Sequence, residues 1–325
     1  MAVIEDRDDL LPVQKVGEIM PSQEPPWLIE HLWQMSAAGI IGGQPKCCKS
    51  WFGLEMAVAV ASGMPCMGRF KVVKTGPALI YLAEDASDQV RGRIEGICRA
   101  RSVALSSLDL LLITMPSLRL DSPDHQRQLR ATIAAMRPRL LLLDPLVRLH
   151  RLDENSSREI SGLLGYLREL QRKFDLAVIL THHSSKRERS RPGQGLRGSG
   201  DLHAFGDSNI YLARKRDGLI QVTTEHRGSA AIEPFAIELI SEGESAALSM
   251  VNADLMQNDT EKNQATLSQR ITEHLSYVSS PISKAQLREA LRVNNQKLGD
   301  TLHDLQKQGS IVQNGGGWSL SSPLL

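Results

Sequence analysis

Short apolar runs alternate with longer amphipathic stretches between about residue 27 and residue 241. The apolar runs are nearly continuous, which is typical of parallel strands buried on both faces of a sheet. They lie at residues 39–41, 78–82, 110–115, 140–143 and 176–180. Residues 50–61 and 162–173 carry apolar positions at helical spacing, and Asp121-Ser122-Pro123 resembles a helix start. The alternation predicts an α/β fold with a mostly parallel central sheet and right-handed crossovers.

Three later runs have the pattern of strands without intervening helices. They lie at residues 208–213, 219–225 and 235–240, and we predict that they extend the sheet as antiparallel additions. Residues 1–25 are polar and contain prolines, which indicates an N-terminal arm. The main domain is therefore expected to span residues 26–249.

A second, smaller domain is predicted at residues 267–325, after an Asn-, Asp- and Gln-rich linker at residues 250–266. A first helix is expected at residues 267–278, and Ser283 is placed to cap a second. A third begins at Asn294 or Asn295 and ends at Gly309, and Asn314 with the three following glycines predicts a hairpin turn. Three helices followed by a hairpin resemble a winged-helix domain.

Composition excludes several classes of protein. The 325 residues include 38 Lys plus Arg against 37 Asp plus Glu, so any contact with nucleic acid must come from a local basic cluster. No apolar run approaches the roughly 18 residues that span a bilayer, and the acidic N-terminus lacks a signal-peptide pattern. The four cysteines suggest neither a disulfide framework nor a zinc site. We expect a cytoplasmic protein with reduced thiols and no membrane partner.

A candidate phosphate-binding loop follows the first apolar run and precedes a helical stretch. It consists of Gly43, Gln44, Pro45, Lys46, Cys47, Cys48, Lys49 and Ser50, with Trp51 next in the chain. The pattern matches GxxxxGK[ST], whose amides surround a β-phosphate at the positive end of a helix. Lys49 would neutralise the β- and γ-phosphates and Ser50 would bind Mg²⁺, so ATP and Mg²⁺ are the expected cofactors.

Cys48 departs from that pattern, because the motif has glycine there to let the backbone approach the phosphates. We expect a small side chain to fit if its dihedral angles are helical. A chance Lys-Ser pair at a helix start is the alternative, and the order of the following sites argues against it.

Three later apolar runs each end in a polar residue. Glu84 is placed to polarise an attacking water, although an exposed strand-end acid is the alternative. Asp144 ends a run of four leucines, where a carboxylate can hold Mg²⁺. His182 and His183 end another run, and one of them is a candidate sensor of the γ-phosphate. Doubly wound sheets bind ligands at such strand ends.

A glycine-rich basic segment follows the histidines at residues 184–200. Lys186, Arg187, Arg189 and Arg191 are candidate contacts to DNA phosphates, with a solvated surface loop as the alternative. Arg197 and the cluster Arg214-Lys215-Arg216 are candidates for an arginine finger, which would act in trans only in a ring or filament.

Taken in order, these motifs resemble those of the plasmid RepA-type hexameric helicases and, more broadly, RecA-like AAA-family ATPases of mobile elements. The resemblance implies a RecA fold, ATP sites at subunit interfaces and a homohexameric ring around single-stranded DNA. It assigns phosphate and Mg²⁺ binding to Lys49 and Ser50, water activation to Glu84, the Walker B position to Asp144 and the sensor to His183 with His182. Arg197 matches the interface arginine, and Arg216 resembles the basic finger of the wider helicase superfamily.

The leading hypothesis is a ring-forming DNA helicase or translocase of a plasmid, phage or other mobile element. The alternative is an ATP-gated DNA-binding regulator, loader or recombination mediator that uses the C-terminal domain, and a filament-forming recombinase is a third possibility. Asn295 and Lys297 begin the third C-terminal helix, where side chains can meet DNA bases or phosphates, although winged helices also contact proteins.

Overall fold

The computed structural model describes residues 11, 13–20, 26–184, 200–215, 217–251, 267–278, 280–291, 293 and 295–321. The chain divides into two compact units, Met1–Met250 and Val251–Leu325. Of the predicted site residues, Lys186, Arg187, Arg189, Arg191, Arg197 and Arg216 lie outside the described residues, as do residues 252–266 of the predicted linker. No helix of the described residues is long and apolar enough to cross a bilayer.

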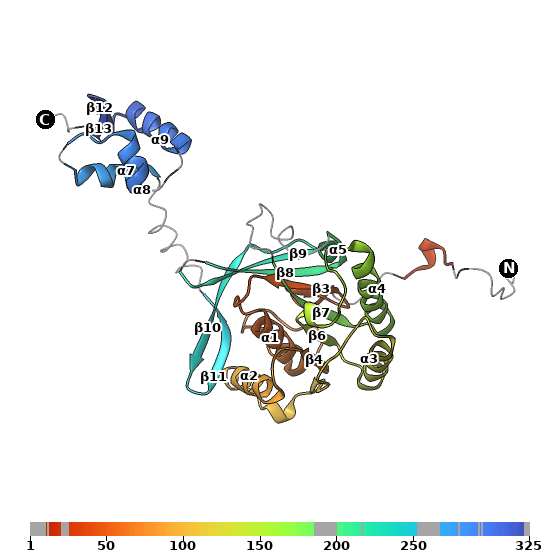
Figure 1. Cartoon of the computed structure of the whole chain (residues 1–325). Coiled ribbons are helices and arrows are strands. Elements are labelled where there is room, and N and C mark those ends of the chain that lie inside the picture. The colour runs from red at the N-terminus through yellow and green to blue at the C-terminus, as the bar shows by residue number, and fades with distance from the viewer. Residues whose placement is uncertain are drawn as a thin grey trace. The chain divides into compact units, whose positions relative to one another are not determined.

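A nine-stranded sheet forms the centre of the first unit, in the order β11-β10-β9-β8-β3-β7-β6-β4-β5 (Figure 1). Its strands are β3 (Ala38–Gly43), β4 (Ala78–Leu82), β5 (Leu110–Leu112), β6 (Leu140–Asp144), β7 (Ala177–His183), β8 (Ser208–Arg214), β9 (Ile220–His226), β10 (Phe235–Glu242) and β11 (Ser245–Met250). The six strands from β8 to β5 pair in parallel, and β9, β10 and β11 pair antiparallel. The mixed α/β fold with a large, mostly parallel sheet confirms the prediction at that level.

One predicted strand direction is wrong. Residues 208–213 were expected to be an antiparallel addition, but β8 pairs in parallel with β3, with Gly43 opposite Leu212. Helix α5 (Gly200–Phe205) lies in the connection from β7 to β8. A connection of this length, with a helix in it, lets β8 run in the same direction as β7. The prediction holds for β9 and β10.

Helices cover both faces of the sheet and form two separate cores. On one face lie α1 (Lys49–Ser62) and α2 (Ser87–Ala100), and on the other lie α3 (Pro123–Met136), α4 (Ser157–Phe174) and α5 (Figure 1). The strands contribute alternate side chains to the two cores, as the pleat requires. Shorter elements are η1 (Val16–Glu18), β1 (Trp27–Ile29), β2 (Trp33–Gln34), η2 (Leu105–Ser107) and η3 (Leu146–Arg148).

A buried ion pair ties α1 to α2 and β11. The Glu55 carboxylate accepts hydrogen bonds from the Arg101 guanidinium at 3.0 and 3.3 Å and from the Leu248 amide at 2.8 Å. Burial raises the pKa of Glu55, and the Arg101 charge partly opposes that rise. Glu55 therefore depends on Arg101 to remain charged inside the protein.

We expect Arg101→Ala to lower the free energy of unfolding by about 3 kcal/mol, because it leaves a buried carboxylate without its counter-charge. In the variant, the folded state binds the Glu55 proton more tightly than the unfolded chain does. Stability is then lost as the pH rises above the ordinary glutamate pKa, so the deficit relative to wild type should be larger at pH 8 than at pH 5. Urea unfolding at both pH values measures this.

The matched control is Arg91→Ala, which removes an exposed ion pair with Glu95 at 2.9 Å. Such a pair contributes at most about 1 kcal/mol, so this variant should stay close to wild type at both pH values. An Arg101→Ala deficit that is small, or equal at both pH values, would show that Arg101 does not compensate the Glu55 charge.

The second unit contains α7 (Leu267–Ser276), α8 (Lys284–Leu291), α9 (Asn295–Lys307), and a hairpin of β12 (Ile311–Asn314) and β13 (Gly317–Leu320). The hydroxyl of Ser283 accepts the Gln286 amide at 3.3 Å, while the Gln286 side chain accepts the Ser283 amide at 3.0 Å, so Ser283 caps α8 as predicted. Among the described residues, the buried apolar core of this second unit consists of Ile271, Leu275, Leu287, Leu291, Leu298, Leu302, Leu305, Ile311 and Trp318.

Two glycines turn the hairpin of this unit. Gly315 and Gly316 have φ angles of 57° and 82°, which suits a two-residue turn between antiparallel strands. Asn295 and Lys297 lie in the first turn of α9, but their side chains are outside the described residues.

Candidate nucleotide site

The loop between β3 and α1 places backbone amides at the start of a fourteen-residue helix. Gly43 ends β3, and a Cβ there would lie 2.5 Å from both the Cys47 sulfur and the Leu212 carbonyl oxygen, so only glycine fits. The amides of α1 that lack partners within the helix, together with the helix dipole, favour an anion at this end. The predicted strand–loop–helix arrangement is therefore present around residues 43–50.

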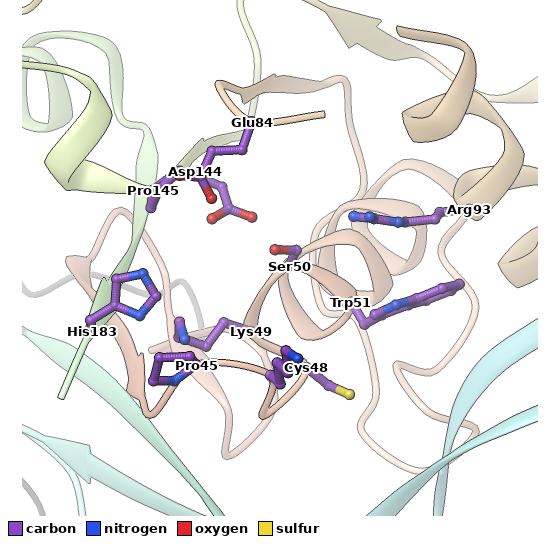
Figure 2. Close-up of a pocket in the computed structure, with 11 residues that line it drawn as sticks. Pro45, Cys48, Lys49, Ser50, Trp51, Glu84, Arg93, Asp144, Pro145 and His183 are labelled. Carbon is purple, nitrogen blue, oxygen red and sulfur yellow. The ribbon is translucent and has the colours of Figure 1, made fainter. Parts of the chain in front are cut away.

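Cys48 does not have the helical dihedral angles that would let a small side chain fit without strain. It has φ 63° and ψ 29°, in the left-handed region that favours glycine, and Lys46 has φ 64°. A non-glycine residue there costs roughly 1–2 kcal/mol, so the loop is held against two local strains. The Cys48 sulfur points away from the carboxylates of Glu84 and Asp144 (Figure 2).

Lys49 is buried with its ammonium inside the loop. Its Nζ donates to the carbonyl oxygens of Gly43 at 3.0 Å and Gln44 at 2.9 Å. Only 7% of the residue is exposed, so the charge has little solvent to stabilise it. The same Nζ lies 3.9 Å from the Cys47 sulfur. A buried ammonium that donates to neutral groups attracts an anion strongly, as expected for a phosphate-binding lysine.

Asp144 ends β6 and faces Ser50 (Figure 2). Its carboxylate accepts hydrogen bonds from the hydroxyls of Ser50 and of Thr181 on the neighbouring β7. Burial raises the pKa of Asp144, while these two hydroxyls and the Lys49 charge oppose the rise. Its Oδ2 is buried without a hydrogen-bond partner.

These features fit Mg²⁺ bound with a triphosphate. A buried carboxylate with an unsatisfied oxygen, beside a serine hydroxyl, offers two oxygen ligands, and Mg²⁺ takes its remaining ligands from phosphates and water. Among the described residues, no three His, Cys, Asp or Glu side chains gather as a metal cluster, which argues against an all-protein metal cage. Ser50 and Asp144 are thus the residues that would hold the ion.

Glu84 lies just beyond the end of β4 and is paired with an arginine. The Glu84 Oε1 accepts a hydrogen bond from Arg148 Nε at 2.7 Å, and half of the Glu84 side chain is exposed. Arg148 belongs to η3, which follows Asp144 in the chain. The pair places a carboxylate at the mouth of the site, where it can reach water.

The two histidines of β7 lie in different surroundings. His183 lines the cavity together with Lys49 and Asp144 (Figure 2). His182 is 1% exposed, and its Nδ1 lies 3.7 Å from the Glu154 carboxylate. Successive residues of a strand point to opposite faces, so the structure brings His183 but not His182 into the site.

One cavity of about 380 Å³ joins these groups at the carboxyl ends of β3, β7, β6 and β4, which are neighbours in the sheet. This edge is where doubly wound sheets bind ligands. Its lining residues are Pro45, Lys46, Cys48, Lys49, Ser50, Trp51, Glu84, Arg93, Asp144, Pro145 and His183. Gly43, Gln44 and Cys47 complete the loop without lining the cavity.

Arg93 was not predicted as a site residue. Its guanidinium donates two hydrogen bonds of 2.8 Å to Asp85 and lies 5.9 Å from the centre of the Trp51 ring. Asp85, which directly follows Glu84 in the chain, thus orients this arginine at the cavity. Arg148 was also missed as the partner of Glu84.

Two solved structures are similar to part of this chain. The crystal structure of the RadB recombinase matches with a TM-score of 0.49 and 16% identity, covering 67% of this chain and 92% of that chain. A second match is the structure of a DnaB-like replicative helicase, reported together with its interactions with primase. It has a TM-score of 0.48 and 17% identity, and the match covers 66% of this chain and 57% of that chain.

The sequence model of the AAA domain family matches residues 5–189, which is more than half of the chain. The matched region contains the phosphate loop, Glu84, Asp144 and both histidines of β7. It confirms the RecA-like P-loop class indicated by the order of the motifs. The chain therefore belongs to the AAA domain family.

Proposed function

We propose that this protein is an ATP-driven, DNA-acting motor, and specifically a ring-forming hexameric helicase or translocase of a plasmid, phage or other mobile element. The observation that carries the ATPase part of the proposal is the convergence of separate chain segments on one cavity. Lys49, Ser50, Glu84, Asp144 and His183 all line it. A chance Lys-Ser pair would have no reason to face a buried aspartate and a strand-end glutamate.

Each of these side chains has a role in the proposal. Lys49 binds the β- and γ-phosphates, and Ser50 with Asp144 holds Mg²⁺. Glu84 orients the attacking water and accepts its proton. ATP supplies the phosphoryl group that is transferred to water. His183 contacts the γ-phosphate and conveys its presence to the segment that follows β7.

The DNA part of the proposal concerns residues near that segment. Lys186, Arg187, Arg189 and Arg191 follow His183 within a few positions, so a shift of His183 on hydrolysis would move them along a bound strand. Either Arg197 or Arg216 would complete the ATP site of the neighbouring subunit. The C-terminal unit would act as a winged helix that contacts DNA through Asn295 and Lys297.

The test uses the full chain. We expect single-stranded DNA to raise its ATP turnover several-fold, ATP to drive unwinding of a forked duplex, and closed rings to appear by electron microscopy with a non-hydrolysable ATP analogue. Replacing the four basic residues at 186, 187, 189 and 191 by alanine should remove the DNA stimulation and keep the basal turnover. The matched control for lost charge replaces four exposed basic residues elsewhere in the same unit, Lys71, Arg91, Arg127 and Arg158, by alanine.

The C-terminal unit has its own apolar core, which favours one alternative function. In that alternative the protein is an ATP-gated regulator, loader or recombination mediator, and this unit provides the contact to duplex DNA. This alternative predicts tight, ATP-dependent binding to duplex DNA, no increase of ATP turnover by single-stranded DNA and no unwinding. Those results would support the ATP-gated regulator and contradict the motor. Helical filaments instead of rings would indicate a recombinase.

A further inference from the structure

The phosphate loop contains two left-handed residues that are not glycine. Lys46 and Cys48 have φ angles of 64° and 63°, and Cys48 stands where the loop motif has its second glycine. A loop with such strain leaves its binding conformation unless other groups hold it. The question is therefore which part of the protein holds residues 46–48 in place.

One arginine contacts both strained residues. Arg214 Nη2 donates to the carbonyl oxygen of Lys46 at 3.0 Å and lies 3.9 Å from the Cys48 sulfur. Arg214 Nη1 donates to the carbonyl oxygen of Gly218 at 2.8 Å. The same guanidinium thus joins the phosphate loop to the turn between β8 and β9.

The sheet gives this arginine a firm base. Arg214 is the last residue of β8, and β8 pairs in parallel with β3, which leads into the loop. Gly43 at the base of the loop lies opposite Leu212, two residues before Arg214. Arg214 does not line the nucleotide cavity, so its contacts act on the loop from outside.

We propose that Arg214 is a positioning residue that clamps the phosphate loop in its nucleotide-binding conformation and thereby offsets the missing glycine at position 48. The inference rests on the proposed function, namely that the loop binds ATP. The planar guanidinium holds its donors in a fixed fork, so Nη1 reaches the Gly218 carbonyl while Nη2 reaches the Lys46 carbonyl and the Cys48 sulfur, whereas an ammonium has all its donors on one nitrogen. The clamp raises the fraction of molecules that can bind nucleotide, and apparent affinity follows that fraction.

A double-mutant cycle tests the clamp with four full-length proteins: wild type, Arg214→Ala, Cys48→Gly, and the two changes combined. We expect Arg214→Ala to raise the Kd for Mg·ATP and the KM of turnover about tenfold with little change in kcat. Cys48→Gly alone should bind Mg·ATP more tightly than the wild type, because glycine removes the strain at position 48. The combined variant should bind ATP within about twofold of Cys48→Gly, because a loop without strain at position 48 has little need of the clamp.

Comparing the effect of Arg214→Ala in the wild-type protein and in the Cys48→Gly protein distinguishes a clamp from a direct phosphate contact. If Arg214 bound phosphate, its loss would lower the affinity by the same factor in the wild-type and Cys48→Gly backgrounds, and that result would overturn the proposal. An Arg214→Ala protein that binds ATP as tightly as wild type would overturn it too. Arg214→Lys should bind ATP with an affinity between those of wild type and Arg214→Ala, and thermal unfolding checks that each variant is folded.

The cycle also separates this inference from the proposed function. If the wild type fails to bind Mg·ATP, the ATPase proposal fails and the clamp fails with it. If the wild type binds and turns over ATP but the cycle is additive, only the clamp fails. Intrinsic fluorescence of Trp51, which lines the cavity, reports binding directly, and Trp51→Phe identifies its share of the signal.

Discussion

Lys49→Ala should abolish ATP binding and lower turnover by about 10²-fold or more. Lys49 provides the positive charge inside the phosphate loop, and its Nζ already lies among the loop carbonyls, 3.0 Å from that of Gly43. Charge-assisted hydrogen bonds to phosphate are about twice as strong as neutral ones, and removing one preorganised donor in a dry site typically costs about 10²–10³-fold in rate. Titration with Mg·ATP, followed by Trp51 fluorescence, and steady-state turnover measure the two effects.

The matched control for this prediction is Lys71→Ala, which removes an exposed lysine outside the cavity. It should bind and hydrolyse ATP as the wild type does. The fold should survive Lys49→Ala, because the Gly43 carbonyl also accepts a hydrogen bond from the Ser184 amide at 3.1 Å. A Lys49→Ala protein that is folded and retains normal affinity for ATP would show that the triphosphate binds elsewhere.

The residues at the strand ends could be predicted from the sequence for a simple physical reason. A parallel strand buried on both faces is a nearly continuous apolar run, so its end is visible as the first polar residue. Glu84 and Asp144 were found in this way, and the order of parallel strands then brings such ends to one edge of the sheet. The sheet order itself, with β7 between β3 and β6, has no comparable signal.

The same continuous pattern explains why the histidines could not be separated. A strand with alternating polar and apolar residues shows which side faces the core, but residues 176–180 are apolar on both faces, and Thr181 follows them. Only the positions of Glu154 and of the cavity distinguish the buried His182 from His183. Tertiary structure therefore decides which of two successive residues at the end of a strand points into the site.

The partners of long charged side chains could not be predicted either, because these partners lie far away in the sequence. Arg148 reaches Glu84 across 64 positions, and Arg214 reaches Lys46 across 168. Helix α2 is a different case, since Val90, Ile94 and Ile97 stand at helical spacing and all three are buried. That helix was missed although its signal was present, and Arg93 was missed with it.

Glu84→Gln should preserve ATP binding and slow hydrolysis by about 10²–10³-fold. The amide has the size of the carboxylate but cannot accept a proton from water, and general-base catalysis contributes about 10²–10⁴-fold in rate. Glu84 lines the mouth of the cavity and does not contact the phosphate loop, so the loss should appear in kcat while the Kd for Mg·ATP stays close to wild type. Single-turnover hydrolysis measures the chemical step separately from product release.

The control for Glu84→Gln must account for its ion pair with Arg148. Glu95→Gln makes the same chemical change at another glutamate paired with an arginine, in this case Arg91 at 2.9 Å, outside the cavity. It should hydrolyse ATP at the wild-type rate, which shows that losing a surface ion pair is not the cause. Normal turnover by Glu84→Gln would remove Glu84 as the base and leave Asp85, the other carboxylate that follows β4, as the next candidate, although its hydrogen bonds to Arg93 occupy both of its oxygens.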